Sequence, residues 1–198
     1  MTLDTVSRRA VLKSLGMSVA VGSVLRVIPV EAAEHAHHMI EAEKDGAAGA
    51  YAPKFFDAHG FKTLQGLADT IMPPDADSGG AVEGGAPEFI DLLSSENPEY
   101  RATLGEFFGW LDAACTKRYG KAWVDCAKGQ QTEILDLVAY RKNAEHDASL
   151  EKAVYGFSFL RNFVADGFFT SKVGIRYLGY KGNTYLTEFP GCPPVPGV

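Results

Sequence analysis

Apolar side chains recur every three or four positions in five segments of the chain, which is the spacing of helices that bury one face. These segments run over 61–72, 87–93, 98–115, 130–141 and 150–164. No stretch alternates apolar and polar residues convincingly enough to predict a strand. The pattern therefore predicts an all-α fold, a single small helical domain of about five helices.

Residues that start and stop helices flank these segments. The proline pair at 73–74 ends the first segment, and Pro87 suits the first turn of the second. Asn97 and Pro98 form a cap and first-turn pair for the third segment, which Gly120 ends. The boundaries thus agree with the periodicity.

Three regions lack an apolar period. Residues 34–51 are rich in alanine, glutamate, histidine and glycine, and we expect a flexible N-terminal arm there. Residues 142–149 read as a polar linker, in which Asp147 or Ser149 caps the following helix. The last thirty residues are dense in glycine and aromatics and close with four prolines, so we expect an irregular tail that propagates no helix.

The N-terminus carries a twin-arginine pair, Arg8 and Arg9, followed by Lys13 and a modestly apolar stretch. This order of features is typical of a twin-arginine (Tat) export signal, which a receptor reads as an address. Small residues place cleavage after Ala32, with Ala33 as the second choice. The other interpretation is an amphipathic N-terminal helix of an uncleaved cytoplasmic protein.

The chain therefore divides into a Tat signal peptide over 1–32, a flexible arm over 33–53 and a helical domain over 54–198. The leader holds four of the 19 Lys and Arg and two of the 25 Asp and Glu, so the remainder carries 15 and 23, a net charge of −8. This scattered negative charge disfavours binding to nucleic acid and provides no electrostatic attraction to an anionic bilayer. We expect membrane association only through a partner.

Three cysteines are present: Cys115, Cys126 and Cys192. An exported chain meets an oxidising compartment, and a bridge between Cys115 and Cys126 would close a short loop around Gly120. The sequence does not decide this pairing. There is no CxxC or CxxCH motif, which excludes the usual zinc, iron–sulfur and covalent haem sites.

The candidate sites for a transition metal and for calcium have a simpler structural interpretation. His35, His37 and His38 could hold a transition metal, but a mobile arm supplies no groups to orient the rings. Asp75 and Asp77 resemble the start of a calcium loop, yet position 12 of that loop is an alanine, so we expect aspartates that cap a polar turn.

The sequence offers little support for catalysis. The available acid–base pairs are His59 near Asp57 and His146 beside Asp147, and both read as caps or solvated groups. The glycine motifs of phosphate-binding loops and of serine hydrolases are absent. We therefore expect no catalytic residue and no cofactor-binding residue in this chain.

A glycine- and aromatic-rich segment near the C-terminus suits a protein interface. Tyrosines supply large contact areas at low entropic cost, and glycines let a backbone approach closely. We expect the phenylalanines to face inward and the tyrosines outward. The predicted interface residues are Phe168, Phe169, Gly174, Tyr177, Leu178, Gly179, Tyr180, Gly182 and Asn183.

Two stretches carry a resemblance to a known family. The run GFFTSKVGIRYLGYKGN over 167–183, together with IMPPDADSGGAVEGG over 71–85, resembles the gluconate 2-dehydrogenase subunit 3 family. In that family a twin-arginine leader precedes a helix ending in a proline–aspartate loop, several more helices and a near-C-terminal segment rich in glycine and tyrosine. The resemblance spans most of residues 7–192, and its strongest block is 174–183.

The resemblance implies a function for the whole chain. Such proteins are small accessory subunits of membrane-associated sugar or alcohol dehydrogenases. Their catalytic partner is an FAD-dependent flavoprotein of the glucose-methanol-choline oxidoreductase type, and a multihaem cytochrome c passes its electrons on. The small subunit binds the flavoprotein in the cytoplasm, helps it mature in a chaperone-like way and supplies the only Tat signal, so the complex reaches the periplasm. FAD and haem c are expected in the partner subunits.

Two alternatives remain open from the sequence. The first is an independent periplasmic metal-binding protein that uses the arm with His35, His37 and His38. The second is a stand-alone enzyme, which would require activity from the purified chain without a partner.

Overall fold

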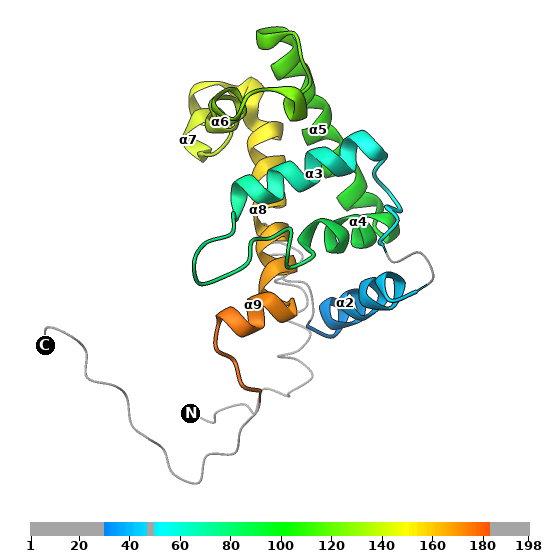
Figure 1. Cartoon of the computed structure of the whole chain (residues 1–198). Coiled ribbons are helices and arrows are strands. Elements are labelled where there is room, and N and C mark those ends of the chain that lie inside the picture. The colour runs from blue at the N-terminus through cyan, green and yellow to red at the C-terminus, as the bar shows by residue number, and fades with distance from the viewer. Residues whose placement is uncertain (1–29, 47–49, 183–198) are drawn as a thin grey trace, which may run out of the picture.

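The computed structural model describes residues 30–46 and 50–182 (Figure 1). Within these residues the chain is all-α, with no strand, which confirms the predicted fold class. The elements are α2 (Val30–Lys44), α3 (Ala58–Ile71), α4 (Ala86–Glu96), α5 (Pro98–Tyr119), the 3-10 turn η1 (Trp123–Asp125), α6 (Lys128–Asp136), α7 (Arg141–His146), the 3-10 turn η2 (Ala148–Leu150), α8 (Glu151–Phe169) and α9 (Lys172–Tyr177).

Helix α8 forms the centre of the fold and packs on both α4 and α5. Phe107 of α5 and Phe89 of α4 are buried against it. Close approach depends on glycine, because a Cβ at Gly156 of α8 would lie 2.6 Å from the Phe107 Cβ. Glycine at this position therefore sets the spacing between α5 and α8.

The predicted start and stop residues of α3 and α5 act as expected in the structure, whereas Asp147 caps the 3-10 turn η2 and α8 has no side-chain cap. The Asn97 side chain accepts hydrogen bonds from the backbone N–H groups of Glu99 and Tyr100 at the start of α5. Gly120 ends that helix in the left-handed conformation, with φ of 72°. At the start of α3, Asp57 accepts from the Gly60 N–H at 2.7 Å.

Three expectations about irregular regions were wrong. The supposed flexible arm contains most of the fifteen-residue helix α2, which begins within the predicted leader. The supposed linker at 142–149 contains most of α7, and the supposed irregular tail contains α9. The predicted helix over 130–141 ends at Asp136, and α7 follows it separately. Helix α2 escaped notice because its buried face consists mostly of Ala33 and Ala36, which give a weak apolar signal.

A buried carboxylate fixes the segment between α2 and α3. Asp91 of α4 is fully buried and accepts hydrogen bonds from the Tyr51 hydroxyl and from the backbone N–H groups of Lys54, Phe55 and Phe56, at 2.6 to 3.1 Å. Burial, and then the bond to Asp91, raise the pKa of the Tyr51 hydroxyl. This group of four donors on one carboxylate, which we term the Asp91 clamp, holds the segment on α4.

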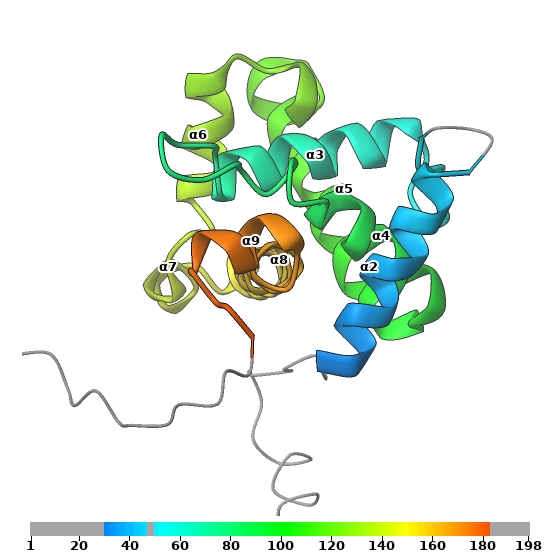
Figure 2. The ribbon, with the colours of Figure 1, turned by 60° about the horizontal axis from the view of Figure 1, so that its bottom comes forward.

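The elements are distributed over two ends of the molecule. Helices α2 and α9 lie at one end, and α6 and α7 lie towards the other (Figure 1). Figure 2 views α8 nearly end on, with α9 beside its C-terminal end. Among the described residues, no helix is both long enough and apolar enough to cross a membrane.

Candidate functional site

The corner between α8 and α9 is built by one buried serine. Ser171 caps α9, because its hydroxyl oxygen accepts from the Gly174 N–H at 3.1 Å and donates to the Phe168 carbonyl at 2.6 Å. A Cβ at Gly174 would lie only 2.1 Å from that carbonyl oxygen. Glycine is therefore required where the first turn of α9 meets the last turn of α8, whereas its predicted role at an interface stays a prediction.

Beyond this corner, large apolar side chains are exposed. Ten large hydrophobic residues are exposed in the described part of the chain, and half of them fall between residues 169 and 180. Their exposed fractions range from 37% to 59%. We name this group the α9 surface; its members are Phe169, Ile175, Tyr177, Leu178 and Tyr180.

The structure divides the predicted interface residues into two groups. Phe168 and Gly174 are buried and shape the corner, whereas Phe169, Tyr177, Leu178 and Tyr180 are exposed. The expectation that the phenylalanines face inward thus holds for Phe168 and is wrong for Phe169, because the helix turns successive side chains by about 100°.

The remaining predicted interface residues either determine the backbone conformation or lie outside the residues that the structure describes. Gly179 and Gly182 adopt left-handed conformations, with φ of 64° and 82°, which turn the chain after α9. Asn183 lies outside the described residues. Sequence reasoning missed Ile175, which its spacing from Leu178 in a short helix could have revealed.

Helix α2 packs beside this corner through a histidine. The His37 ring stacks on Phe89, with centroids 5.0 Å apart, and its Nε2 lies 2.9 Å from the Thr170 Oγ1. The Thr170 hydroxyl donates to the Asp166 carbonyl, so His37 is the donor in this pair and neutral His37 carries its proton on Nε2. Burial lowers the pKa of His37, against the opposing effect of Glu41.

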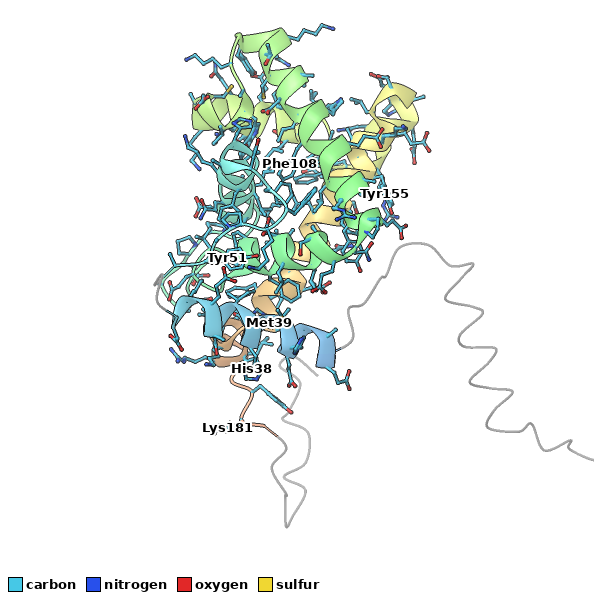
Figure 3. All side chains as sticks on the ribbon, turned by 90° about the vertical axis from the view of Figure 1, so that its right-hand side faces the viewer. His38, Met39, Tyr51, Phe108, Tyr155 and Lys181 are labelled. Atoms are coloured by element: carbon cyan, nitrogen blue, oxygen red, sulfur yellow. The ribbon has the colours of Figure 1, made fainter. Side chains whose placement is uncertain are left out.

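Ion pairs join α2 to neighbouring helices along its second half. Lys172 at the start of α9 donates to Glu41 at 2.8 Å, and Lys44 donates to Glu88 of α4 at 2.8 Å. The bond from Lys172 lowers the pKa of Glu41. Figure 3 shows His38 and Met39 on α2 at the end of the molecule where Lys181 follows α9.

The three arm histidines do not act as a unit. His35 and His38 are exposed, whereas His37 is engaged by Phe89 and Thr170. Within the described ranges, no three His, Cys, Asp or Glu side chains are grouped as a metal site would need.

The predicted calcium-like loop is an aspartate-capped turn. The Asp75 carboxylate accepts from the backbone N–H groups of Asp77 and Ser78, at 2.9 and 2.8 Å. The Ala81 N–H donates to the Met72 carbonyl and closes the loop at its base. This confirms the interpretation of Asp75 as a cap, whereas Asp77 contributes only its backbone N–H to the turn.

At the other end of α3, a surface histidine pairs with an acid that the sequence did not indicate. His59 lies 2.7 Å from the Asp112 Oδ2, and the other oxygen of Asp112 accepts from the Trp123 N–H at 2.9 Å. The bond to Asp112 raises the pKa of His59. Asp57, the partner predicted from sequence, caps α3 instead.

The candidate disulfide residues are brought together as thiols. Cys115 and Cys126 are free and buried, and the Cys126 thiol donates to the Ala122 carbonyl at 3.4 Å. Burial, with Cys126 as a further cause, raises the pKa of the Cys115 thiol to about 12. Their pairing in an oxidising compartment stays a prediction, and Cys192 lies outside the described residues.

The second predicted acid–base pair, His146 and Asp147, is also not assembled in the structure. Asp147 caps the 3-10 turn η2 through bonds from the Ser149 N–H and hydroxyl, while His146 is exposed at the end of α7. Both pairs thus place their aspartates in caps, as the sequence indicated.

The comparison with protein families identifies the group to which this architecture belongs. The family model described as gluconate 2-dehydrogenase subunit 3 matches residues 58–191, about two thirds of the chain. The chain belongs to this family. No curated protein and no solved structure matches it.

Membership of the gluconate 2-dehydrogenase subunit 3 family makes the chain a subunit of a dehydrogenase complex. The matched residues contain α3 to α9 and the whole α9 surface. Helix α2 precedes the match, although its Ala33, Ala36 and Ile40 belong to the same hydrophobic core. The family domain and α2 are therefore packed as one body.

Proposed function

We propose that this chain is the non-catalytic small subunit of a periplasmic, membrane-associated, FAD-dependent sugar or alcohol dehydrogenase complex. It binds and stabilises the catalytic flavoprotein subunit and supplies the twin-arginine signal for export. A multihaem cytochrome c subunit would accept the electrons. FAD and haem c would reside in these partners, with no cofactor in this chain.

The observation that carries the proposal is the α9 surface within the family-matched region. Exposed apolar groups gathered over twelve residues are typical of protein–protein contact. Tyr177 and Tyr180 offer broad contact area with few rotatable bonds. Ser171 and Gly174 hold the surface at a fixed angle to α8, so little ordering is needed on binding.

The position of α2 supports a coupling between binding and export. Arg8 and Arg9 lie outside the described residues, but the leader continues directly into α2 at Val30. Helix α2 is joined to the α8–α9 corner by the His37–Thr170 and Glu41–Lys172 contacts. A flavoprotein bound at the α9 surface would therefore travel with the chain that bears the signal.

Replacement of both signal arginines by lysine tests the proposal. In cells that express the whole complex, the R8K/R9K variant should leave the flavoprotein subunit in the cytoplasm, because the export receptor requires the arginine pair. The measurement is immunoblotting of both subunits after cell fractionation. Normal periplasmic levels of the flavoprotein would contradict the passenger role, and co-purification from the cytoplasm controls for intact binding.

A further inference from the structure

The two bonds at which the leader is predicted to be removed lie inside helix α2. The helix begins at Val30, so the bonds that follow Ala32 and Ala33 belong to its first turn. Ala33 is 1% exposed and is part of the hydrophobic core. A signal peptidase requires small residues at its site, but proteases generally cut exposed and flexible segments. Of the two residues that precede these bonds, Ala32 is exposed, whereas Ala33 suits cleavage and also holds the fold.

The buried face of α2 continues beyond the predicted bonds. Ala33, Ala36, His37 and Ile40 have the spacing of one helical face, and the two alanines and the isoleucine are at most 4% exposed. This face packs on α4. The His37 contacts with Phe89 and Thr170 fix its middle.

Cleavage in this place requires part of the helix to open. A protease binds several consecutive residues in extended form, and extension of residues 30–37 would withdraw Ala33 and Ala36 from the core and break the His37–Thr170 bond. The ion pairs of Glu41 and Lys44 lie beyond the opened part and would remain. When opening is fast relative to cutting, the cleavage rate follows the population of the open form.

We infer that docked α2 shields the processing site, so that the leader is removed only from molecules whose N-terminal turns of α2 have detached. The inference rests on the proposed role of the leader in export. Its consequence is that a folded subunit retains its signal until α2 opens, so the lifetime of the signal is linked to the packing of α2 on α4 and on the α8–α9 corner.

The direct test moves the same bond out of the helix. In the variant, a flexible glycine–serine linker and a second copy of residues 30–33 are inserted between Ala33 and Glu34, so that α2 is restored after an exposed copy of the site. Purified full-length protein in detergent is incubated with a bacterial signal peptidase, and intact mass is followed with time. The insertion variant should be cut at least tenfold faster than the native chain.

A matched pair of substitutions tests the role of docking. Ile40→Asp places a charge in the core eight residues beyond the first predicted bond, whereas Met39→Asp adds the same charge at a neighbouring side chain that is 41% exposed. Ile40→Asp should accelerate cleavage about tenfold, and Met39→Asp should leave the native rate. Circular dichroism melting must show that the remaining helices of Ile40→Asp still unfold cooperatively.

Two results would overturn the inference. The first is equal cleavage of the native chain and the insertion variant. The second is resistance of the insertion variant itself, because α2 would then have no cleavable site to shield. The assay requires neither export nor a partner, so its failure is distinct from failure of the passenger role in the R8K/R9K experiment.

Discussion

Around Trp123 the chain buries its large apolar side chain completely, whereas around α9 it leaves large apolar groups exposed. Trp123 is fully buried, its backbone N–H donates to the Asp112 carboxylate, and its backbone carbonyl accepts from the Gln131 side chain at 3.0 Å. At the α9 surface, Leu178 is 59% exposed although it follows a tightly fixed corner. The difference indicates that rigidity at Trp123 serves the fold, whereas rigidity at the α8–α9 corner serves to present a surface.

The largest expected effect comes from removing the Trp123 side chain. Trp123→Ala should lower the free energy of unfolding by about 3–5 kcal/mol, because it removes a fully buried ring from its contact with Gly66 of α3. Urea unfolding followed by circular dichroism gives the value. A loss below about 1 kcal/mol would show that this end is less tightly packed than its burial indicates.

A smaller effect, confined to binding, is expected at the α9 surface. Leu178→Asp should weaken binding to the flavoprotein subunit at least tenfold, which is about 1.4 kcal/mol, because a charge would be desolvated in the interface. Unfolding free energy should change by less than about 0.5 kcal/mol, since the side chain is exposed. Affinity is measured by surface plasmon resonance with the purified partner.

The chain offers a matched control for this substitution. Tyr155 is 51% exposed on α8, and Figure 3 places it well away from His38, Met39 and Lys181. Tyr155→Asp should bind the flavoprotein as tightly as the native chain. Equal losses from Tyr155→Asp and Leu178→Asp would mean that the α9 surface is not the contact.

The smallest expected effect is a pH dependence of opposite sign at the two ends. Burial lowers the pKa of His37 below 6.5, so its contribution to stability is present above that pH and is lost as the pH falls through the lowered pKa. The bond to Asp112 raises the pKa of His59, so its contribution is present below pH 6.5 and is lost as the pH rises through the raised pKa.

Single substitutions separate the two contributions. His37→Gln should cost more stability at pH 7.5 than at pH 5.5, and His59→Gln should cost more at pH 5.5. Urea unfolding at both pH values measures these differences, and NMR titration of the two imidazoles checks the order of their pKa values. A higher pKa for His37 than for His59 would contradict the assignment.

The sequence predicted the elements whose signals are strong and local. Asn97 and Gly120 marked both ends of α5 because caps depend on neighbouring residues. Helix α2 was missed because its burial depends on alanines that fit against α4, which only the assembled fold reveals. The contacts of His37 were not predicted for the same reason, since its partners Phe89 and Thr170 lie far away in the sequence.

The candidate site was predicted in part for similar reasons. The composition of the C-terminal segment indicated exposed tyrosines, and Tyr177 and Tyr180 are exposed. It gave no indication that α9 forms, because the helix has only six residues, too few for an apolar period, and glycines and aromatics surround its Ser171 cap. The pairing of His59 with Asp112 joins α3 to α5 and was equally beyond local pattern.

The Asp91 clamp also determines how the molecule would respond to mechanical force. A pull on the leader would reach α2 first, whose contacts lie in series along the helix and can separate one after another. It would then meet the Asp91 carboxylate, where four hydrogen bonds between residues 51 and 56 and α4 share the load in parallel. Tension on the leader would therefore peel α2 first, and α3 to α9 would stay folded around the α9 surface.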